Sequence, residues 1–336
     1  MSVFVIAELS ANHNHDLALA KKTMEAAKRA GADAVKLQTY TADTITIECD
    51  KPCFQIDSGT LWDGTTLYEL YKKAYTPWEW HAELFEYGRS LGLEVFSTPF
   101  DYTAVDFLET LDNPIYKIAS FEAMDYPLVA YAAAKGKSML ISVGLLTLNE
   151  IDAAVKACHD AGNMDVTLLV CTSEYPAKPE DAQLLKISDL ASRFGVKVGL
   201  SDHTMGSAVA SAAVALGASV VEKHFIINRE MGGLDSAFSM DAAEFAQMVD
   251  TIRIVESATS TLDYTKMGAS RIHARSLFVV KDVKKGDVFT AENLRSIRPS
   301  DGLHPKYYPQ TLGSIAQCDI ERGTPLSWDM TDAEQK

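Results

Sequence analysis

Short apolar runs rich in β-branched residues recur from the amino terminus to Phe225, and they alternate with segments whose apolar residues follow a helical period. This alternation is typical of βαβ units, which build parallel sheets. Eight such units close a (β/α)8 barrel. The eight runs are Val3–Ala7, Asp33–Leu37, Leu93–Ser97, Ile115–Ala119, Ser138–Val143, Val166–Val170, Val196–Leu200 and Ser219–Val221, which continues to Phe225. The sequence therefore predicts an α/β protein built on a TIM barrel.

The barrel pattern ends near Ser257. The next residues are polar and resemble a linker, and short apolar runs separated by turns at Gly286 and Gly323 follow them. We therefore expect a barrel over residues 1–257, a linker over 258–271 and a small, mostly β domain over 272–336.

One connection in the barrel, from Tyr40 to Tyr75, is far longer than the others. Long connections of this kind are usually functional or disordered. Because it carries Trp62, Tyr68 and Tyr71, we expect it to cover the mouth of the barrel.

The chain has 46 acidic and 31 basic residues, a formal net charge of −15. The electrostatic field of this net negative charge repels phosphate backbones and anionic membranes, so neither nucleic acid nor a membrane is an expected partner.

The five cysteines form no CxxC pair, and the first apolar run stops at Glu8, too early for a signal peptide. We expect a cytoplasmic protein with reduced thiols.

Polar residues follow the ends of most of the expected strands, where the active sites of (β/α)8 enzymes lie. One such residue alone can be a surface or capping residue, but their recurrence from strand to strand indicates an active site. The set includes Glu8, Lys36, Gln38, Ser97, Thr98, Lys117, Ser120, Glu122, Ser142, Ser173, Tyr175, Asp202, His203, Glu222, Lys223 and His224.

His203 and His224 end consecutive strands, so both imidazoles should face the same mouth. Two imidazoles and a carboxylate suit a divalent metal such as manganese, iron or zinc, with positions left open for water and substrate. Glu8, on the first strand, is a candidate acid, base or partner of the metal's water. Its structural alternative is an ion pair with a barrel lysine.

Lys36 and Lys117 lie within apolar strands, where an unpaired ammonium group is costly. With nearby hydroxyls such as those of Ser97, Ser120 and Ser173, they could bind a phosphate or carboxylate. A Schiff-base lysine, as in a metal-independent aldolase, and a structural Lys–Glu pair are the alternatives.

Several segments together resemble the sialic acid synthase family, and the resemblance covers nearly the full chain. They are Ile6–His13, Val35–Thr39, Phe96–Phe100, Tyr116–Ser120, Gly199–Thr204 and Glu222–Phe225. Enzymes of this family condense phosphoenolpyruvate with an amino-sugar aldehyde to form a nonulosonic acid. They end in an antifreeze-like (SAF) domain, to which Arg275–Asp329 is similar.

Further segments most resemble the branch of the family that makes pseudaminic acid. They are Leu61–Tyr71, Cys171–Pro176, Asp235–Ser239 and Arg298–Lys306. The sugar that this implies is 2,4-diacetamido-2,4,6-trideoxy-L-altrose. Ser173 departs from the Asn that is typical of N-acetylneuraminate synthases. N-acetylneuraminate and legionaminic acid synthesis remain alternatives, as does a non-catalytic carbohydrate-binding protein.

The resemblance also implies a role for each matching residue. His203 and His224 would hold a divalent metal, with manganese our choice, and Glu8 would act on its water or on the sugar aldehyde. Phosphoenolpyruvate would be bound by Lys36, Lys117, Ser120 and Ser173, with Gln38, Ser97 and Tyr175 nearby. Glu122 and Asp235 would contact the sugar. Arg298 would reach the sugar in a partner's barrel, which implies a domain-swapped homodimer.

Overall fold

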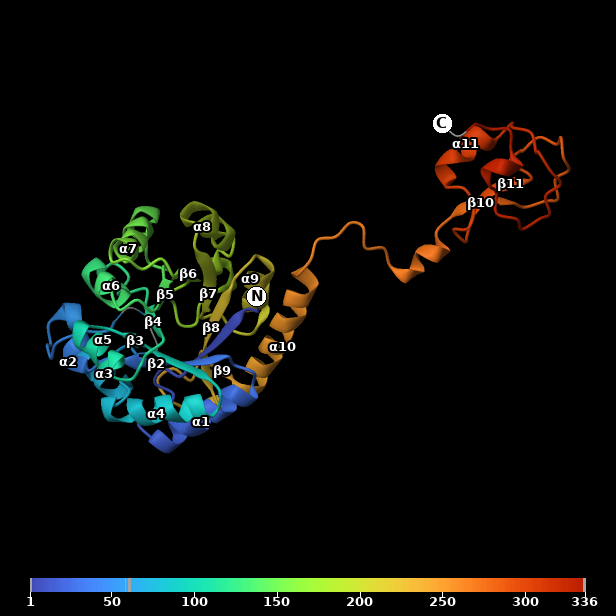
Figure 1. The fold of residues 1–336 in the computed structure, drawn as a ribbon. Coiled ribbons are helices and arrows are strands. Elements are labelled where there is room, and N and C mark those ends of the chain that lie inside the picture. The colour runs from blue at the N-terminus through green and yellow to red at the C-terminus, as the bar shows by residue number, and fades with distance from the viewer. Residues whose placement is uncertain (1, 58, 60–61, 335–336) are drawn as a thin grey trace. The chain divides into compact units, whose positions relative to one another are not determined.

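The computed structural model describes all residues except 1, 58, 60–61 and 335–336, and it divides into two compact units, Met1–Ser260 and Thr261–Lys336. In the first unit, eight parallel strands are ordered as in the sequence, and the last strand pairs with the first (Figure 1). The strands are β1 (Phe4–Glu8), β2 (Ala34–Thr39), β3 (Glu94–Pro99), β4 (Ile115–Ile118), β5 (Ser138–Ser142), β6 (Val166–Cys171), β7 (Lys197–Asp202) and β8 (Val220–Ile226). Each predicted apolar run is a strand, so the expected (β/α)8 barrel is confirmed.

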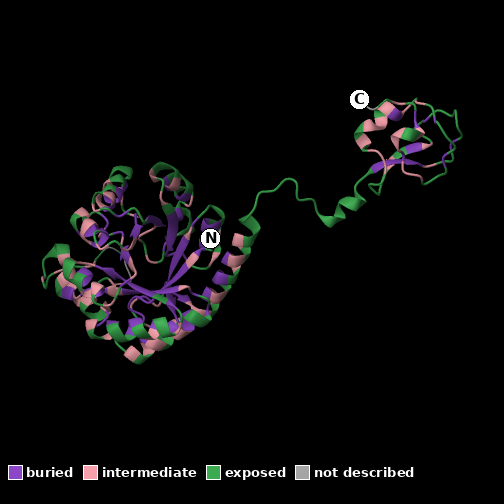
Figure 2. Cartoon of the chain, in the orientation of Figure 1, coloured by how far each residue is buried: buried purple, intermediate pink, exposed green. Residues whose placement is uncertain are grey.

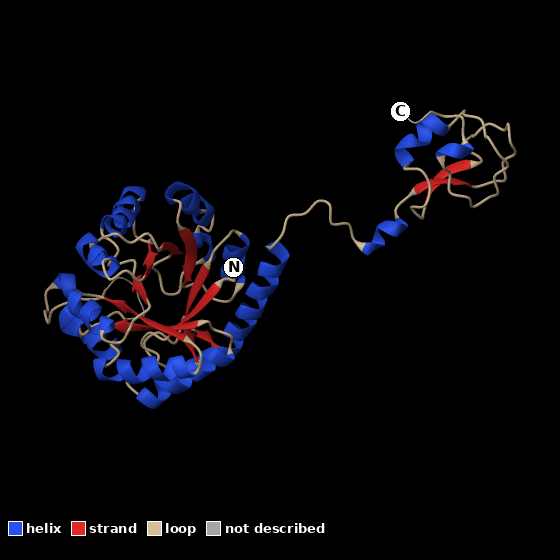
Figure 3. Cartoon of the chain, viewed as in Figure 1, coloured by secondary structure: helices blue, strands red, loops and turns tan. Residues whose placement is uncertain are grey.

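Helices surround the strands (Figure 3). They are α1 (Leu17–Arg29), α2 (Ala42–Ile45), α3 (Leu67–Ala74), α4 (Trp78–Ser90), α5 (Tyr102–Glu109), α6 (Tyr126–Ala133), α7 (Leu148–Asp160), α8 (Lys186–Phe194), α9 (Ala208–Ala215) and α10 (Ala242–Thr259). Local sequence sets their ends. Asp16 caps α1, Thr147 and Glu150 form a capping box at α7, and Gly195 ends α8 with a φ of +64°.

Two short features complete the first unit. The long connection after β2 holds α2, a 3-10 turn (Pro52–Phe54) and α3, and a two-residue strand, β9 (Met240–Asp241), pairs with β8. Further 3-10 turns cover Pro179–Ala182 and Arg229–Met231. No helix among the described residues is long and apolar enough to span a membrane.

The interior of the barrel has an apolar layer beneath a polar one. The strands are almost wholly buried (Figure 2), and the apolar layer consists of Ile6, Ala34, Phe96, Ile115, Leu140, Leu169 and Val220. Side chains on a strand alternate between its two faces, so the residue two places further along points to the same side. These next inward residues are Glu8, Lys36, Thr98, Lys117, Ser142, Cys171 and Glu222. The apolar layer therefore forms the floor of a polar site.

The second unit is small and has its own core. Two strands, β10 (Ser276–Val279) and β11 (Leu294–Ile297), form an antiparallel pair, and isolated antiparallel bridges such as Val283–Ile320 extend the pairing. A short helix, α11 (Tyr308–Thr311), and 3-10 turns at Ala269–His273, Pro305–Tyr307 and Trp328–Met330 complete it. Leu277, Val279, Phe289, Leu294 and Leu326 are almost fully buried in its core.

Candidate active site

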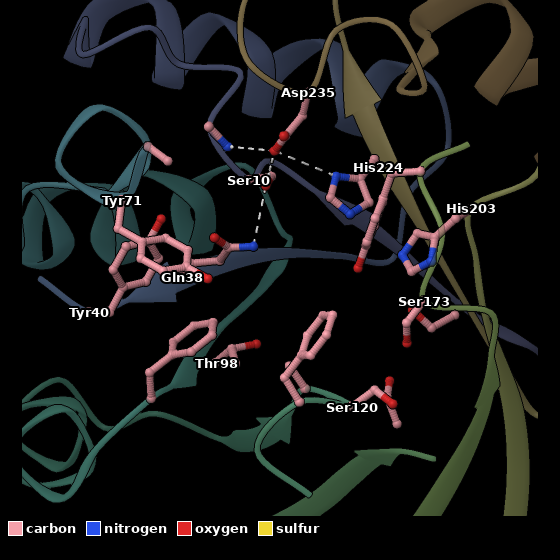
Figure 4. Close-up of a pocket in the computed structure, with 18 of the residues that line it drawn as sticks. Ser10, Gln38, Tyr40, Tyr71, Thr98, Ser120, Ser173, His203, His224 and Asp235 are labelled. Carbon is pink, nitrogen blue, oxygen red and sulfur yellow. Dashed lines mark hydrogen bonds and ion pairs between the residues drawn. The ribbon is translucent and has the colours of Figure 1, made fainter. Parts of the chain in front are cut away.

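A cavity of about 470 Å³ opens at the carboxyl ends of the barrel strands. Most of the residues predicted for the site line it (Figure 4), although they come from widely separated parts of the sequence. These are Lys36, Gln38, Lys117, Ser120, Glu122, Ser173, Tyr175, His203, His224 and Asp235. The closed barrel brings them together because its parallel strands all end at the same rim.

Three predicted residues lie elsewhere. Glu8 is fully buried beneath the cavity, where it contacts Lys36. Ser97 points away from the cavity, and its hydroxyl lies 2.7 Å from the Thr39 hydroxyl. The next residue, Thr98, lines the cavity in its place, because successive strand residues face opposite sides. Arg298 is exposed on the second unit.

The two buried lysines contact two buried carboxylates and share one of them, that of Glu222. Lys36 Nζ lies 2.8 Å from Glu8 Oε2 and 3.4 Å from Glu222 Oε1, while Lys117 Nζ lies 3.5 Å from that same Glu222 oxygen. Lys36 also donates to the Thr98 hydroxyl at 3.2 Å. The predicted alternative of a structural Lys–Glu ion pair is thus present for Lys36, which pairs with Glu8. Lys117 has no carboxylate of its own and only shares Glu222 with Lys36.

This unequal pairing separates the two lysines electrostatically. Burial alone would lower the pKa of Lys36, but the carboxylates of Glu222 and Glu8 outweigh burial and raise it. For Lys117, burial prevails over the attraction of Glu222 and lowers the pKa. An anion in the cavity would therefore be stabilised most by Lys117, whose charge is the less compensated.

Both site histidines are neutral at physiological pH. Burial lowers the pKa of His203 to about 4, and burial also lowers the pKa of His224 well below its usual range, with the charges of His203 and Lys36 adding to the effect. The ring centroids are 5.3 Å apart, and both rings face the same space in Figure 4. His203 Nδ1 lies 2.8 Å from the Thr172 carbonyl oxygen, so this nitrogen donates and Nε2 keeps its lone pair.

The histidine pair fits a divalent metal in its chemistry. A metal-binding histidine usually donates its second ring N–H to a carbonyl or carboxylate, as His203 does to Thr172. In His224, Nδ1 is buried and has no hydrogen-bond partner among the described residues. The described residues contain no group of three or more His, Cys, Asp or Glu side chains arranged to hold a metal. The two imidazoles would therefore be the protein's ligands, and water or substrate would supply the remaining ligands.

Polar groups on one side of the cavity are held in a defined arrangement. Asp235 accepts hydrogen bonds from the Ser10 hydroxyl and the Ala11 N–H, and its Oδ2 lies 4.0 Å from His224 Nδ1 (Figure 4). Gln38 donates to Glu8 at 3.0 Å and to Ser10 at 3.3 Å. Burial raises the pKa of Asp235. These groups can orient a polar substrate beside the histidines.

Unsatisfied groups gather at the cavity, which indicates that a polar ligand belongs there. Four buried side-chain atoms that line it have no hydrogen-bond partner among the described residues. They are Glu122 Oε2, Ser142 Oγ, Glu222 Oε2 and His224 Nδ1. Unpaired buried polar atoms are rare in proteins and costly, so bound substrate or water is expected to satisfy them.

Aromatic side chains bound the other side of the cavity. Tyr175 lies 4.4 Å from the His203 ring and 5.1 Å from Phe238, measured between ring centroids. Trp62, from the long connection, is 6.0 Å from Tyr175, and its Nε1 donates to the Leu234 carbonyl at 3.2 Å. Tyr71 from the same connection also lines the cavity, while Tyr68 bonds Asp43 instead.

Glu222 belongs to the polar set at the strand ends, but it is the main site residue to which the sequence analysis assigns no role of its own. Its position two residues before His224 on the same strand is the signal that it shares the inward face. The lining residues Ser10, Tyr40 and Phe238 lie beyond the ends of strands, so strand alternation alone could not place them.

A comparison with protein families matches residues 23–264 to the NeuB family and residues 274–331 to the SAF domain. The first match covers most of the chain. The chain belongs to the NeuB family. The resemblance to sialic acid synthases is thus confirmed, and the SAF domain falls within the second compact unit.

Relatives that match this NeuB protein include bacterial synthases of related sugars. Pseudaminic acid synthase of Helicobacter pylori is 48% identical over 97% of this chain and 96% of its own length. N,N'-diacetyllegionaminic acid synthase of Legionella pneumophila is 36% identical over 99% of this chain and 96% of its own. The crystal structure of spore coat polysaccharide biosynthesis protein SpsE of Bacillus subtilis is 30% identical, with a TM-score of 0.66 over 100% of this chain and 96% of that one.

Proposed function

We propose that this NeuB protein is a pseudaminic acid synthase. It condenses phosphoenolpyruvate with 2,4-diacetamido-2,4,6-trideoxy-L-altrose, breaks the C–O bond of phosphoenolpyruvate and releases phosphate to give a nonulosonic acid. The cavity supports this proposal because it combines an under-compensated lysine, Lys117, with two neutral imidazoles. The 48% identity to the H. pylori enzyme, against 36% to the legionaminic relative, supports the choice of sugar.

Phosphoenolpyruvate binds on the lysine side of the cavity in this proposal. Lys117 and Lys36 counter the charge of its phosphate and carboxylate, and the hydroxyls of Ser120 and Ser173 donate to its oxygens. The Ser120 hydroxyl is already held by the Leu145 N–H at 3.0 Å, so its proton can point into the cavity. As C3 attacks the sugar aldehyde and water adds to C2, the lysines stabilise the negative charge on the departing phosphate.

His203 and His224 would hold a divalent ion, with manganese our choice, and it would polarise the sugar aldehyde when bound. The low pKa values of these imidazoles keep them unprotonated, as metal ligands must be. Asp235 and Glu122 accept hydrogen bonds from sugar hydroxyl or amide groups. Glu8, which contacts Lys36 beneath the cavity, would be the final proton acceptor: the Lys36 ammonium group would pass one proton to Glu8 and take one up from the water that adds to C2. Tyr175 and Gln38 border the reacting atoms.

We also propose that the protein acts in the cytoplasm as a domain-swapped homodimer. Arg298 of one subunit would then complete the sugar site in its partner's barrel. Its exposure on the second unit is compatible with such a contact.

The decisive assay measures phosphate release from phosphoenolpyruvate with Mn²⁺ and three sugars in parallel. We expect release with the altrose-derived sugar and little with the legionaminic precursor or with N-acetylmannosamine. Preference for either of these would keep the reaction but overturn the choice of sugar. No release with any sugar would favour the Schiff-base aldolase, tested by borohydride trapping, or the carbohydrate-binding protein, tested by calorimetry with each sugar.

A further inference from the structure

A buried ion pair precedes the two site histidines on the neighbouring strands β7 and β8. In the register of these strands, Ser201 is opposite Glu222 and Asp202 is opposite Lys223. Ser201 and Glu222 line the cavity, and so do the next residues, His203 and His224. Because side chains alternate along a strand, Asp202 and Lys223 face the opposite side of the barrel wall. The pair is thus adjacent in sequence to both imidazoles but outside the cavity.

The ion pair has a complete set of partners. Lys223 is 2% exposed and Asp202 is 3% exposed. Lys223 Nζ donates to Asp202 Oδ2 at 2.6 Å and to the backbone carbonyls of Thr204 and Gly206 at 2.5 and 3.1 Å. The other carboxylate oxygen of Asp202 accepts from the Thr204 N–H at 2.9 Å and from its hydroxyl at 2.8 Å. An ammonium group has three N–H donors, and all three are used here.

These bonds fasten the loop that begins with His203 to the strand that carries His224. Lys223 reaches from β8 to two carbonyls of the loop, and Asp202 holds the same loop from β7. The backbone carbonyl of His203 itself accepts a hydrogen bond from the Ala177 N–H at 3.0 Å. A shift of the loop would therefore move the His203 ring relative to His224, whose centroid is 5.3 Å away.

Stability alone does not account for such a pair. Desolvation of two charges costs roughly what their attraction returns, so apolar residues of similar volume are often as stable or more so. The directional bonds to Thr204 and Gly206 have no apolar equivalent. We propose that Asp202 and Lys223 are positioning residues that set the separation and orientation of His203 and His224. The role assigned to the histidines rests on the proposed function, in which they hold the metal.

The variant that tests this is Asp202→Asn/Lys223→Met. It removes both charges together, and the Asn amide can still bond Thr204, so no uncompensated charge remains to unfold the barrel. The single variant Lys223→Met is measured beside it. Arg253→Met is the matched control, because Arg253 donates to Asp33 at 2.9 Å and to the Val3 carbonyl at 2.7 Å, far along the strands from the cavity.

Two readouts separate positioning from general stability. We expect the dissociation constant for Mn²⁺, measured by electron paramagnetic resonance without substrate, to rise in the double variant. The expected rise is about 10- to 100-fold, the typical loss of metal affinity when residues that orient metal ligands are replaced. We also expect the imidazole ¹⁵N signals of His203 and His224 to shift in the metal-free protein. Arg253→Met should lower the unfolding midpoint yet leave both readouts as in the wild type.

The outcomes distinguish this inference from the proposed function. A folded double variant with wild-type Mn²⁺ affinity and unchanged imidazole signals would overturn the positioning role. If the wild type itself does not bind Mn²⁺, the proposed metal site fails. The imidazole signals then decide alone whether the ion pair sets the histidine geometry, since they need no metal.

Discussion

At the scale of single residues, Glu122 combines a buried, unpaired carboxyl oxygen with a position on the cavity wall. Burial, only partly offset by Lys117, raises the pKa of Glu122 from an ordinary 4.5 to about 7. Between these pH values the unfolded chain releases a proton that the folded protein retains. The stability of the fold therefore falls as pH rises towards 7 and then levels off.

Glu122→Gln removes this titration and should stabilise the fold relative to wild type at neutral pH. The difference in free energy of unfolding should grow by up to about 3 kcal/mol between roughly pH 5 and pH 8. Urea denaturation at a series of pH values measures it, with Glu86→Gln on the exposed face of α4 as control. A difference that stays constant over this range would contradict the raised pKa.

Lys117→Ala should abolish turnover and leave the barrel folded. Lys117 is the lysine with the weaker carboxylate pairing, so its removal takes away the charge most available to phosphoenolpyruvate. Phosphate release and circular dichroism test the two parts of this prediction. Lys135→Ala, which loses an ion pair to Asp106 outside the cavity, is the control. Near-wild-type rates in folded Lys117→Ala would contradict the proposed anion site.

At the scale of elements, strand β7 comes unusually close to its neighbours at Gly199. A Cβ atom there would lie 2.5 Å from the Val220 carbonyl oxygen and 2.9 Å from a Leu169 methyl group. Gly199→Ala should therefore destabilise the fold by about 3 kcal/mol and reduce turnover, because β7 leads into His203. Thermal unfolding checks this against Gly268→Ala, where the added methyl group meets nothing within 4 Å. Equal midpoints for the two variants would show that β7 can move aside.

Elements were more predictable from the sequence than the details of the site. Each strand has a β-branched apolar core, so periodicity located it to within a few residues. Strand alternation decides which residue of a polar run faces inward. Ser97 and Thr98 are neighbours, but only the Thr98 side chain lines the cavity, while the Ser97 hydroxyl contacts Thr39 behind the strand. Contacts made by connections, such as Trp62 to Leu234, depend on tertiary packing and have no local signature.

At the scale of the whole molecule, the proposed dimer makes Arg298 a residue of the partner's site. Arg298→Ala should raise the KM for the sugar and leave the KM for phosphoenolpyruvate near its wild-type value, because only the sugar would meet this guanidinium. Steady-state kinetics with each substrate varied measures both. Arg295→Ala, on strand β11 of the same unit, is the control. Unchanged sugar kinetics, or a monomer by light scattering, would contradict the cross-dimer contact.

The apolar layer beneath the site has a consequence for how activity is acquired. The polar layer above it takes its members from strands all around the barrel, and β8, the last of the eight barrel strands to be synthesised, supplies both Glu222 and His224. If the helices had formed but β8 had not yet paired with β1, the polar layer of the site would be incomplete. Recovery of turnover during refolding should therefore report closure of the ring of strands, and it should lag behind the recovery of helical signal.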